Sequence, residues 1–135
     1  MLARLQVRNY VLIDSLEIDF PEGLIIITGQ TGAGKSILLG ALSLVMGAKA
    51  DASMVSEGAD NCVVEAEFET ADKTLQNVLE ENEVEWEEGH ITIRRVVNRS
   101  GRSRAFVNDC PVPVTLLQEI SSALIDIHSQ HQTLL

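Results

Sequence analysis

The residues best suited to chemistry lie in one short glycine-rich segment. Residues 29–36 read Gly-Gln-Thr-Gly-Ala-Gly-Lys-Ser and match G-x-x-x-x-G-K-[ST] at every fixed position. Glycines let the backbone curl so that successive N–H groups converge on phosphate oxygens, which a Cβ atom would obstruct. The sequence therefore predicts a phosphate-binding loop made of Gly29, Gln30, Thr31, Gly32, Ala33, Gly34, Lys35 and Ser36.

The two polar residues at the end of this loop have distinct expected roles. Lys35 should reach the β- and γ-phosphates of ATP, and the Ser36 hydroxyl should ligate Mg²⁺. The alternative is a glycine-rich turn that matches the pattern by chance. The context favours nucleotide binding, because an apolar run at 24–27 precedes the loop and a helical pattern follows it.

The surrounding pattern predicts the elements that hold this loop. Alternating apolar residues indicate strands at 2–9, 15–20 and 62–69, and a fully buried strand at 24–27. Helical spacing predicts a largely buried helix at 35–46 capped by Gly47, and a short amphipathic helix carrying Leu75, Val78 and Leu79. A hairpin is expected at 91–97 and 104–108, with Gly101 at positive φ.

The C-terminal part of the sequence predicts one more helix and one more strand. Pro111 and Pro113 should interrupt the chain. Thr115 and Gln118 have the spacing of a capping box at the start of a helix. A short strand at 125–128 then leads to a polar Ser-Gln-His-Gln segment.

Composition limits the class of protein. The chain has 135 residues, enough for one domain, and 45% of them are hydrophobic. Its two cysteines, Cys62 and Cys110, are too few for a disulfide framework and lack zinc-site spacing. Neither a leader segment nor a membrane-spanning run is visible, so we expect a cytoplasmic protein with no membrane partner.

The charge is unevenly distributed. The net charge of −10 argues against a protein that coats nucleic acid with its whole surface. Ten acidic residues fall within 65–88, whereas five arginines fall within 94–104: Arg94, Arg95, Arg99, Arg102 and Arg104. Two interpretations of the basic hairpin stay open: a solvated face that offsets the acidic segment, or a surface for DNA phosphates or a second head.

Three stretches together resemble one family. They are "LARLQVRNYVLIDSLEIDFPEGLIIITGQTGAGKS", "RSGRSRAFVND" and "LIDIHSQHQTLL". In this order they resemble the ATPase heads of the SMC and RecN class of ABC-type ATPases, and RecN-like DNA-repair proteins in particular. The resemblance implies an α/β P-loop NTPase fold, an ABC-ATPase-type N-terminal lobe with a mixed sheet and flanking helices.

The resemblance also implies roles for residues outside the loop. From the residue alone, Gln130 would be a polar residue capping a strand end, but the resemblance favours a match to the Q-loop glutamine, which contacts Mg²⁺. Asn9 and Tyr10 lie where such heads touch ribose or base, but Tyr10 equally fits packing into the core. His128 and His131 flank Gln130, and without a third ligand nearby they favour a polar rim over a metal site.

Two parts of a complete ATPase of this class are not visible. A Walker B strand ending in Asp-Glu is missing, and so is the signature motif of an opposing head. We therefore expect residues 1–135 to be a partial domain, the N-terminal lobe of a longer protein. Its expected partners are the C-terminal lobe of the same protein, a second head and DNA, with the protein near the nucleoid.

Three functions stay open at this stage. The first is an ATP-driven head acting in double-strand break repair and recombination. The second is a self-contained small-molecule or nucleoside kinase, with Asp126 as the Walker B acid and the arginine hairpin as a lid. The third is a nucleotide-sensing module without catalysis. The short apolar run before Asp126 and the lack of a following acid favour a structural role for that residue.

Overall fold

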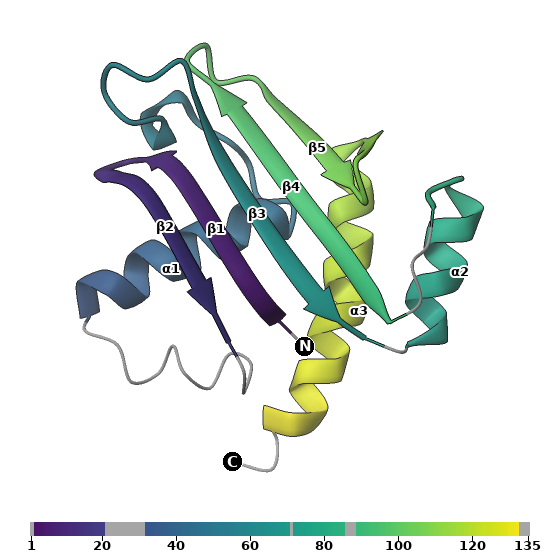
Figure 1. Ribbon diagram of the computed structural model, residues 1–135. Helices are drawn as coiled ribbons and strands as arrows, with labels where there is room; N and C mark the ends of the chain where they lie inside the picture. Colours follow the sequence, from purple (N-terminus) through teal and green to yellow (C-terminus); the bar gives the residue numbers. More distant parts are fainter. Residues whose placement is uncertain (1, 21–31, 71, 86–88, 133–135) are drawn as a thin grey trace.

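A six-stranded antiparallel sheet dominates the described part of the chain (Figure 1). The computed structural model describes residues 2–20, 32–70, 72–85 and 89–132, with side chains from Ser36 onward in the first helix and up to Leu124 in the last. The strands are β1 (Leu2–Tyr10), β2 (Ile13–Asp19), β3 (Asn61–Glu69), β4 (His90–Asn98), β5 (Ser103–Val107) and β6 (Cys110–Val112). Their order in the sheet is β2-β1-β3-β4-β5-β6.

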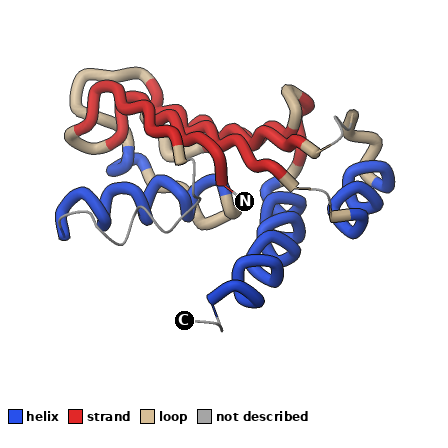
Figure 2. Tube along the Cα trace, turned by 60° about the horizontal axis from the view of Figure 1, so that its bottom comes forward, coloured by secondary structure: helices blue, strands red, loops and turns tan. Residues whose placement is uncertain are grey.

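The sheet has one covered face and one open face. In β3 and β4 every second side chain is buried: Cys62, Val64, Ala66 and Phe68, and Ile91, Ile93, Arg95 and Val97. Their neighbours along each strand stay partly exposed on the other face, as alternation in a half-buried strand requires. Figure 2 shows the helices gathered on one side of the sheet.

Among the described residues, three α-helices form the layer that covers the sheet. They are α1 (Gly32–Val45), α2 (Lys73–Glu81) and α3 (Val114–Gln132). Helix α1 packs against β3 and β4, while α3 packs against β5 and α2. A short 3₁₀ turn, η2 (Ala52–Met54), follows α1 and contacts β4. The apolar residues predicted for these helices therefore form one core with the sheet.

Helix α1 ends in a Schellman motif. The Ala48 N–H donates to the Ser43 carbonyl at 3.0 Å, and the Gly47 N–H donates to the Leu44 carbonyl at 3.2 Å. Gly47 has φ +98, and a Cβ there would lie 2.5 Å from Gln118 Cγ. Glycine at this position thus serves both the left-handed turn and the close approach of α3, and the predicted cap is confirmed.

The hairpin between β4 and β5 also forms as predicted. Gly101 has φ +89. The Asn98 side-chain oxygen accepts hydrogen bonds from the backbone N–H groups of Ser100 at 3.1 Å and Arg102 at 3.2 Å. The Asn98 side chain therefore stabilises the turn by hydrogen bonds to its backbone, in addition to Gly101, which supplies the positive φ.

Three predictions for the C-terminal part were wrong in detail. The strand expected at 125–128 does not form, because α3 continues through Gln132, and a short apolar run alone does not distinguish strand from helix. The Gln118 amide donates to the Gly47 carbonyl at 3.0 Å instead of completing a capping box with Thr115. Pro111 lies within β6, which is tolerated because β6 is an edge strand.

The sequence predicted a mixed sheet. In the described part of the structure, all neighbouring strands of the sheet pair antiparallel. The run at 24–27, which would add a strand next to the phosphate-binding loop, lies outside the described residues.

The contact between Tyr10 and Gly40 yields a stability prediction. A Cβ at Gly40 would lie 2.5 Å from the Tyr10 hydroxyl oxygen but 3.6 Å from Cζ. We expect Gly40→Ala to destabilise the protein by about 1–3 kcal/mol through overpacking. In a Tyr10→Phe background the same change should be neutral, or stabilising by up to about 1 kcal/mol, because alanine favours helix. Denaturant unfolding of both single variants and the double variant measures this, and equal destabilisation in both backgrounds would contradict the contact.

Candidate nucleotide-binding site

The structure places the end of the predicted phosphate-binding loop at the start of α1. Residues 32–36 form the first turn of that helix, and the Ser36 side chain is exposed. No acidic residue lies in this first turn, so its free N–H groups present an uncompensated positive end to an anion. Gly29, Gln30 and Thr31 lie outside the described residues, as do the side chains of Lys35 and Gln130. The described first turn therefore suits an anionic ligand such as a phosphate group.

Asn9 and Tyr10 lie at the end of the first hairpin, as expected. Asn9 is half-buried with φ 54, and Val11 beside it has φ 51, which is unusual for a β-branched residue. This backbone is held by the segment after α1, because the Ser56 N–H donates to the Asn9 carbonyl at 2.8 Å and the Val11 N–H to the Met54 carbonyl at 2.9 Å. Tyr10 is only 7% exposed and belongs to the core, where it lies against Gly40 of α1.

A buried arginine holds the other end of α1. Arg95 of β4 is 2% exposed, and its Nη1 donates to the carbonyls of Leu44 at 2.8 Å and Ala48 at 2.7 Å. Its Nε and Nη2 donate to the Ser103 hydroxyl of β5 at 3.2 and 2.8 Å. The cation therefore sits at the C-terminal, partially negative end of the helix dipole. Burial lowers the pKa of Arg95, and arginine stays charged even so.

Helix α3 binds two further carbonyls at the same end. The Gln118 amide donates to the Gly47 carbonyl at 3.0 Å, and the Ser121 hydroxyl lies 3.0 Å from the Met46 carbonyl. The carbonyls of Leu44, Met46, Gly47 and Ala48 thus accept hydrogen bonds from side chains of β4 and α3. The C-terminus of α1 is fixed from two directions.

The sequence prediction missed this role of Arg95. It grouped Arg95 with the exposed arginines of 94–104, but the alternation of Ile91, Ile93, Arg95 and Val97 places Arg95 in the buried phase of the strand. That alternation is the signal that identifies it. The basic stretch is therefore not one surface, because its members point to opposite faces of the sheet.

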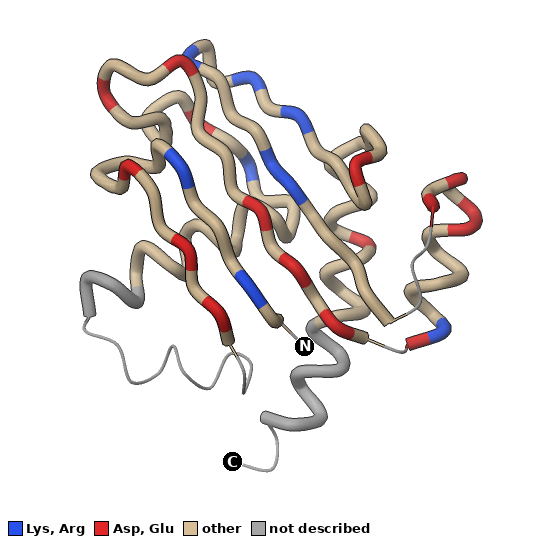
Figure 3. Tube along the Cα trace, viewed as in Figure 1, with Lys and Arg blue, Asp and Glu red and all other residues tan. Residues whose placement is uncertain are grey.

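Of the other four arginines in 94–104, one is paired with carboxylates and three are exposed. Arg94 lies on the open face, 4.5 Å from the centre of the Phe106 ring, and its Nη1 is 2.9 Å from an Asp109 carboxylate oxygen and 3.7 Å from one of Glu65. Arg99, Arg102 and Arg104 are exposed, and Arg99 has a long contact of 3.8 Å to Asp60. Figure 3 shows basic positions over β4 and β5 beside acidic ones on β3.

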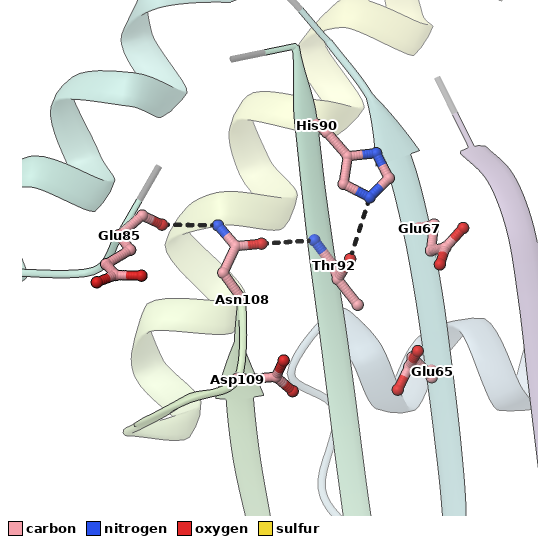
Figure 4. A pocket seen from close by; sticks show the side chains of 7 residues that line it. All are labelled: Glu65, Glu67, Glu85, His90, Thr92, Asn108 and Asp109. Carbon is pink, nitrogen blue, oxygen red and sulfur yellow. Dashed lines mark hydrogen bonds between the residues drawn. The ribbon is translucent and has the colours of Figure 1, made fainter. Parts of the chain in front are cut away.

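An acidic hollow of about 380 Å³ lies on the open face of the sheet. It is lined by Glu65, Glu67, Glu85, His90, Thr92, Asn108 and Asp109 (Figure 4). The Asn108 side chain joins its walls, donating to the Glu85 carbonyl at 2.8 Å and accepting from the Thr92 N–H at 2.9 Å. Its carboxylates would repel a polyphosphate, and it opens on the face away from α1, whose first turn carries the end of the predicted phosphate-binding loop.

Two buried groups have raised pKa values. Burial raises the pKa of the Cys62 thiol to about 11, and burial together with nearby Cys62 raises the pKa of Tyr10. Both cysteines are free thiols, as the sequence predicted. The Cys62 thiol and the Tyr10 hydroxyl are therefore both neutral at physiological pH, and both residues pack under α1.

The described part of the chain carries neither a metal-site cluster nor a membrane-spanning helix. In that part, no group of three or more His, Cys, Asp and Glu residues has the arrangement of a metal site. The side chains of His128 and His131 lie outside it. Among the described helices, none combines the length and the apolar character needed to cross a membrane.

Comparison with known proteins identifies relatives along almost the whole chain. A family model described as an AAA domain matches residues 4–132. The DNA repair protein RecN of Vibrio cholerae is 42% identical over 132 residues, and RecN of Haemophilus influenzae is 37% identical over 134 residues. Each alignment covers 97% of this chain and 24% of the relative, so the chain spans about a quarter of the length of these curated relatives.

Solved structures agree on the fold. A chain from work on ATP-driven dimerization and DNA-stimulated activation of SMC ATPases superposes with a TM-score of 0.69 at 21% identity, covering 92% of this chain and 79% of that one. The SMC head domain from Thermotoga maritima gives 0.57 at 22% identity, covering 87% of this chain and 41% of that one. The recombination mediator RecF gives 0.62 at 19% identity, covering 87% and 29% respectively.

At such identities these structures establish the fold alone, which is the α/β P-loop ATPase-type fold that the sequence predicted. The family follows from the match over residues 4–132 and from the RecN relatives. The chain belongs to the AAA domain family and is RecN-like in sequence.

Proposed function

We propose that this chain is the nucleotide-binding, N-terminal lobe of a RecN-like ATPase head that acts in DNA repair and recombination. The observation that carries the proposal is the P-loop sequence at the start of α1, in a chain 42% identical to a DNA repair protein RecN over 97% of its length. Gly29 to Ser36 would hold ATP, with Lys35 at the β- and γ-phosphates. Ser36 would ligate Mg²⁺, joined by Gln130, and Asn9 would line the nucleoside side, whereas the buried Tyr10 packs in the core.

The lobe would act together with parts that this chain does not supply. The proposed Walker B acid, water-polarising glutamate and signature motif would come from the C-terminal lobe and from a second head. The likeness to a chain from work on ATP-driven dimerization of SMC ATPases supports head pairing. Bound Mg·ATP would supply the phosphoanhydride bond whose cleavage separates the heads, while the residues of this chain bind and orient it.

The kinase alternative is not favoured. A Walker B acid is expected at the end of a buried strand, and residue 126 lies in the backbone of helix α3 instead. The relatives whose sequences align with nearly the whole of this chain are DNA repair proteins. A self-contained phosphotransferase would therefore need an acid that this position does not provide.

The first functional prediction concerns Lys35. Lys35→Ala should weaken Mg·ATP binding by at least about 10- to 100-fold, because the variant cannot form a charge-assisted hydrogen bond to phosphate. Titration of the complete protein with a fluorescent ATP analogue measures this. Lys73→Ala removes an exposed lysine on α2 and should bind like the wild type. Equal affinities for Lys35→Ala and the wild type would overturn the assignment of the loop.

The second concerns turnover. The 135-residue chain alone should hydrolyse ATP far more slowly than an ordinary enzymatic rate on the order of 1 per second. A phosphate-release assay on the chain and on the complete protein tests this. If the chain alone hydrolyses ATP at that ordinary rate, and Asp126→Asn abolishes this activity, the kinase alternative would be supported. The proposal of a partial ATPase head would then be contradicted.

The third concerns DNA. Arg99, Arg102 and Arg104 are the exposed arginines of the β4–β5 hairpin, and we propose that they contact DNA phosphates. Changing all three to Ala should weaken DNA binding. The slope of log affinity against log salt should fall by about 0.9 for each phosphate that the variant no longer neutralises. ATP affinity should not change.

A matched control removes the same charge elsewhere. Arg8, Lys49 and Lys73 are also exposed, and changing them together to Ala alters the net charge equally. This control should keep the wild-type salt slope. If the hairpin variant also keeps it, the hairpin is a solvated face and does not bind DNA.

A further inference from the structure

Among the described residues, Arg95 is the buried charged side chain on the covered face of the sheet. Along β4 the same covered face otherwise carries Ile91, Ile93 and Val97. Among the described residues no carboxylate forms an ion pair with Arg95. Its partners are the Leu44 carbonyl in the last turn of α1, the Ala48 carbonyl just after the helix and the Ser103 hydroxyl. A buried charge is costly unless it is well bonded, so these hydrogen bonds must be specific.

Arg95 bonds to α1 at the end opposite the phosphate-binding loop. Leu44 lies eight residues beyond Ser36, about 12 Å along the helix at 1.5 Å per residue. Because a helix moves as a rod, a shift at its C-terminus displaces the N–H groups and the Ser36 hydroxyl at its N-terminus. The Nη1 group holds the last turn of α1 through Leu44 and the following residues through Ala48, while Ser103 binds the other two nitrogens of the guanidinium.

We infer that Arg95 is a positioning residue for nucleotide binding: through the carbonyls of Leu44 and Ala48 it sets where the first turn of α1 presents its groups to the phosphates. Ser103 is part of this device, since its hydroxyl accepts from both Nε and Nη2 and so orients the guanidinium. The β4–β5 hairpin, which supplies both residues, is thereby joined to the P-loop helix. The inference rests on the proposed nucleotide binding at residues 29–36.

The test compares two adjacent arginines on opposite faces of the sheet. In the complete protein, Arg95→Lys keeps the positive charge but cannot reach two carbonyls and Ser103 together. Arg94→Lys is the matched control, because the Arg94 side chain lies among open-face groups: Glu65, Asp109 and Phe106. Thermal unfolding gives the stability of each variant, and Mg·ATP affinity is measured well below every unfolding midpoint.

Arg95→Lys should bind Mg·ATP roughly tenfold more weakly, the scale of a typical coupling between separated sites. Arg94→Lys should stay within about twofold of the wild type. Ser103→Ala should weaken binding in the same direction by a smaller factor, and it provides the test if Arg95→Lys fails to fold. Wild-type affinity in a folded Arg95→Lys or Ser103→Ala protein would show a purely structural role and overturn the inference alone. Failure of the wild type to bind ATP would overturn the proposed function as well.

Discussion

The arrangement of this fold depends on the hydrogen bonds that the Arg95 cation donates to carbonyls at the C-terminus of α1. Arg95 joins the central strand β4, the neighbouring strand β5 and the helix that follows the phosphate-binding loop. Each buried polar group left without a partner costs about 1–3 kcal/mol, a large part of the roughly 5–15 kcal/mol by which a typical domain is stable. The native position of α1 is therefore the one that satisfies these carbonyls, and Gln118 and Ser121 reinforce it from α3.

The two faces of the sheet have different physical tasks. Among the described residues the covered face is apolar apart from Arg95 and the hydroxyls of Ser103 and Tyr10, and it determines where the helices lie. The open face carries cross-strand charges, such as Arg4 with Glu17 and Arg94 with Glu65, whose contribution to stability is small because they are hydrated. The covered face therefore fixes the helices, while the open face leaves charged side chains accessible to solvent.

The sequence predicted strands from their alternating apolar residues and chain turns from their glycines, but it did not predict polar contacts between distant segments. The alternation in 62–69 and 91–97 predicted β3 and β4, and Gly47 and Gly101 predicted the ends of α1 and of the hairpin. The strand at 125–128 was wrong because an apolar run of that length fits a helix equally well. The hydrogen bonds from Arg95 to residues 44 and 48 join segments 51 and 47 positions apart, and no local pattern encodes such a pair. The phosphate-binding residues were predicted by motif, and their roles stay predictions.

We propose that Mg·ATP binds at the N-terminus of α1, on a helix held from its other end. Hydrogen exchange of the complete protein, followed peptide by peptide with and without Mg·ATP, tests it most directly. We expect the amides of residues 29–36 to gain the largest protection, with little change around the acidic hollow of Glu65, Glu67 and Asp109. Unchanged exchange in 29–36 at saturating Mg·ATP, or protection confined to the hollow, would contradict the claim.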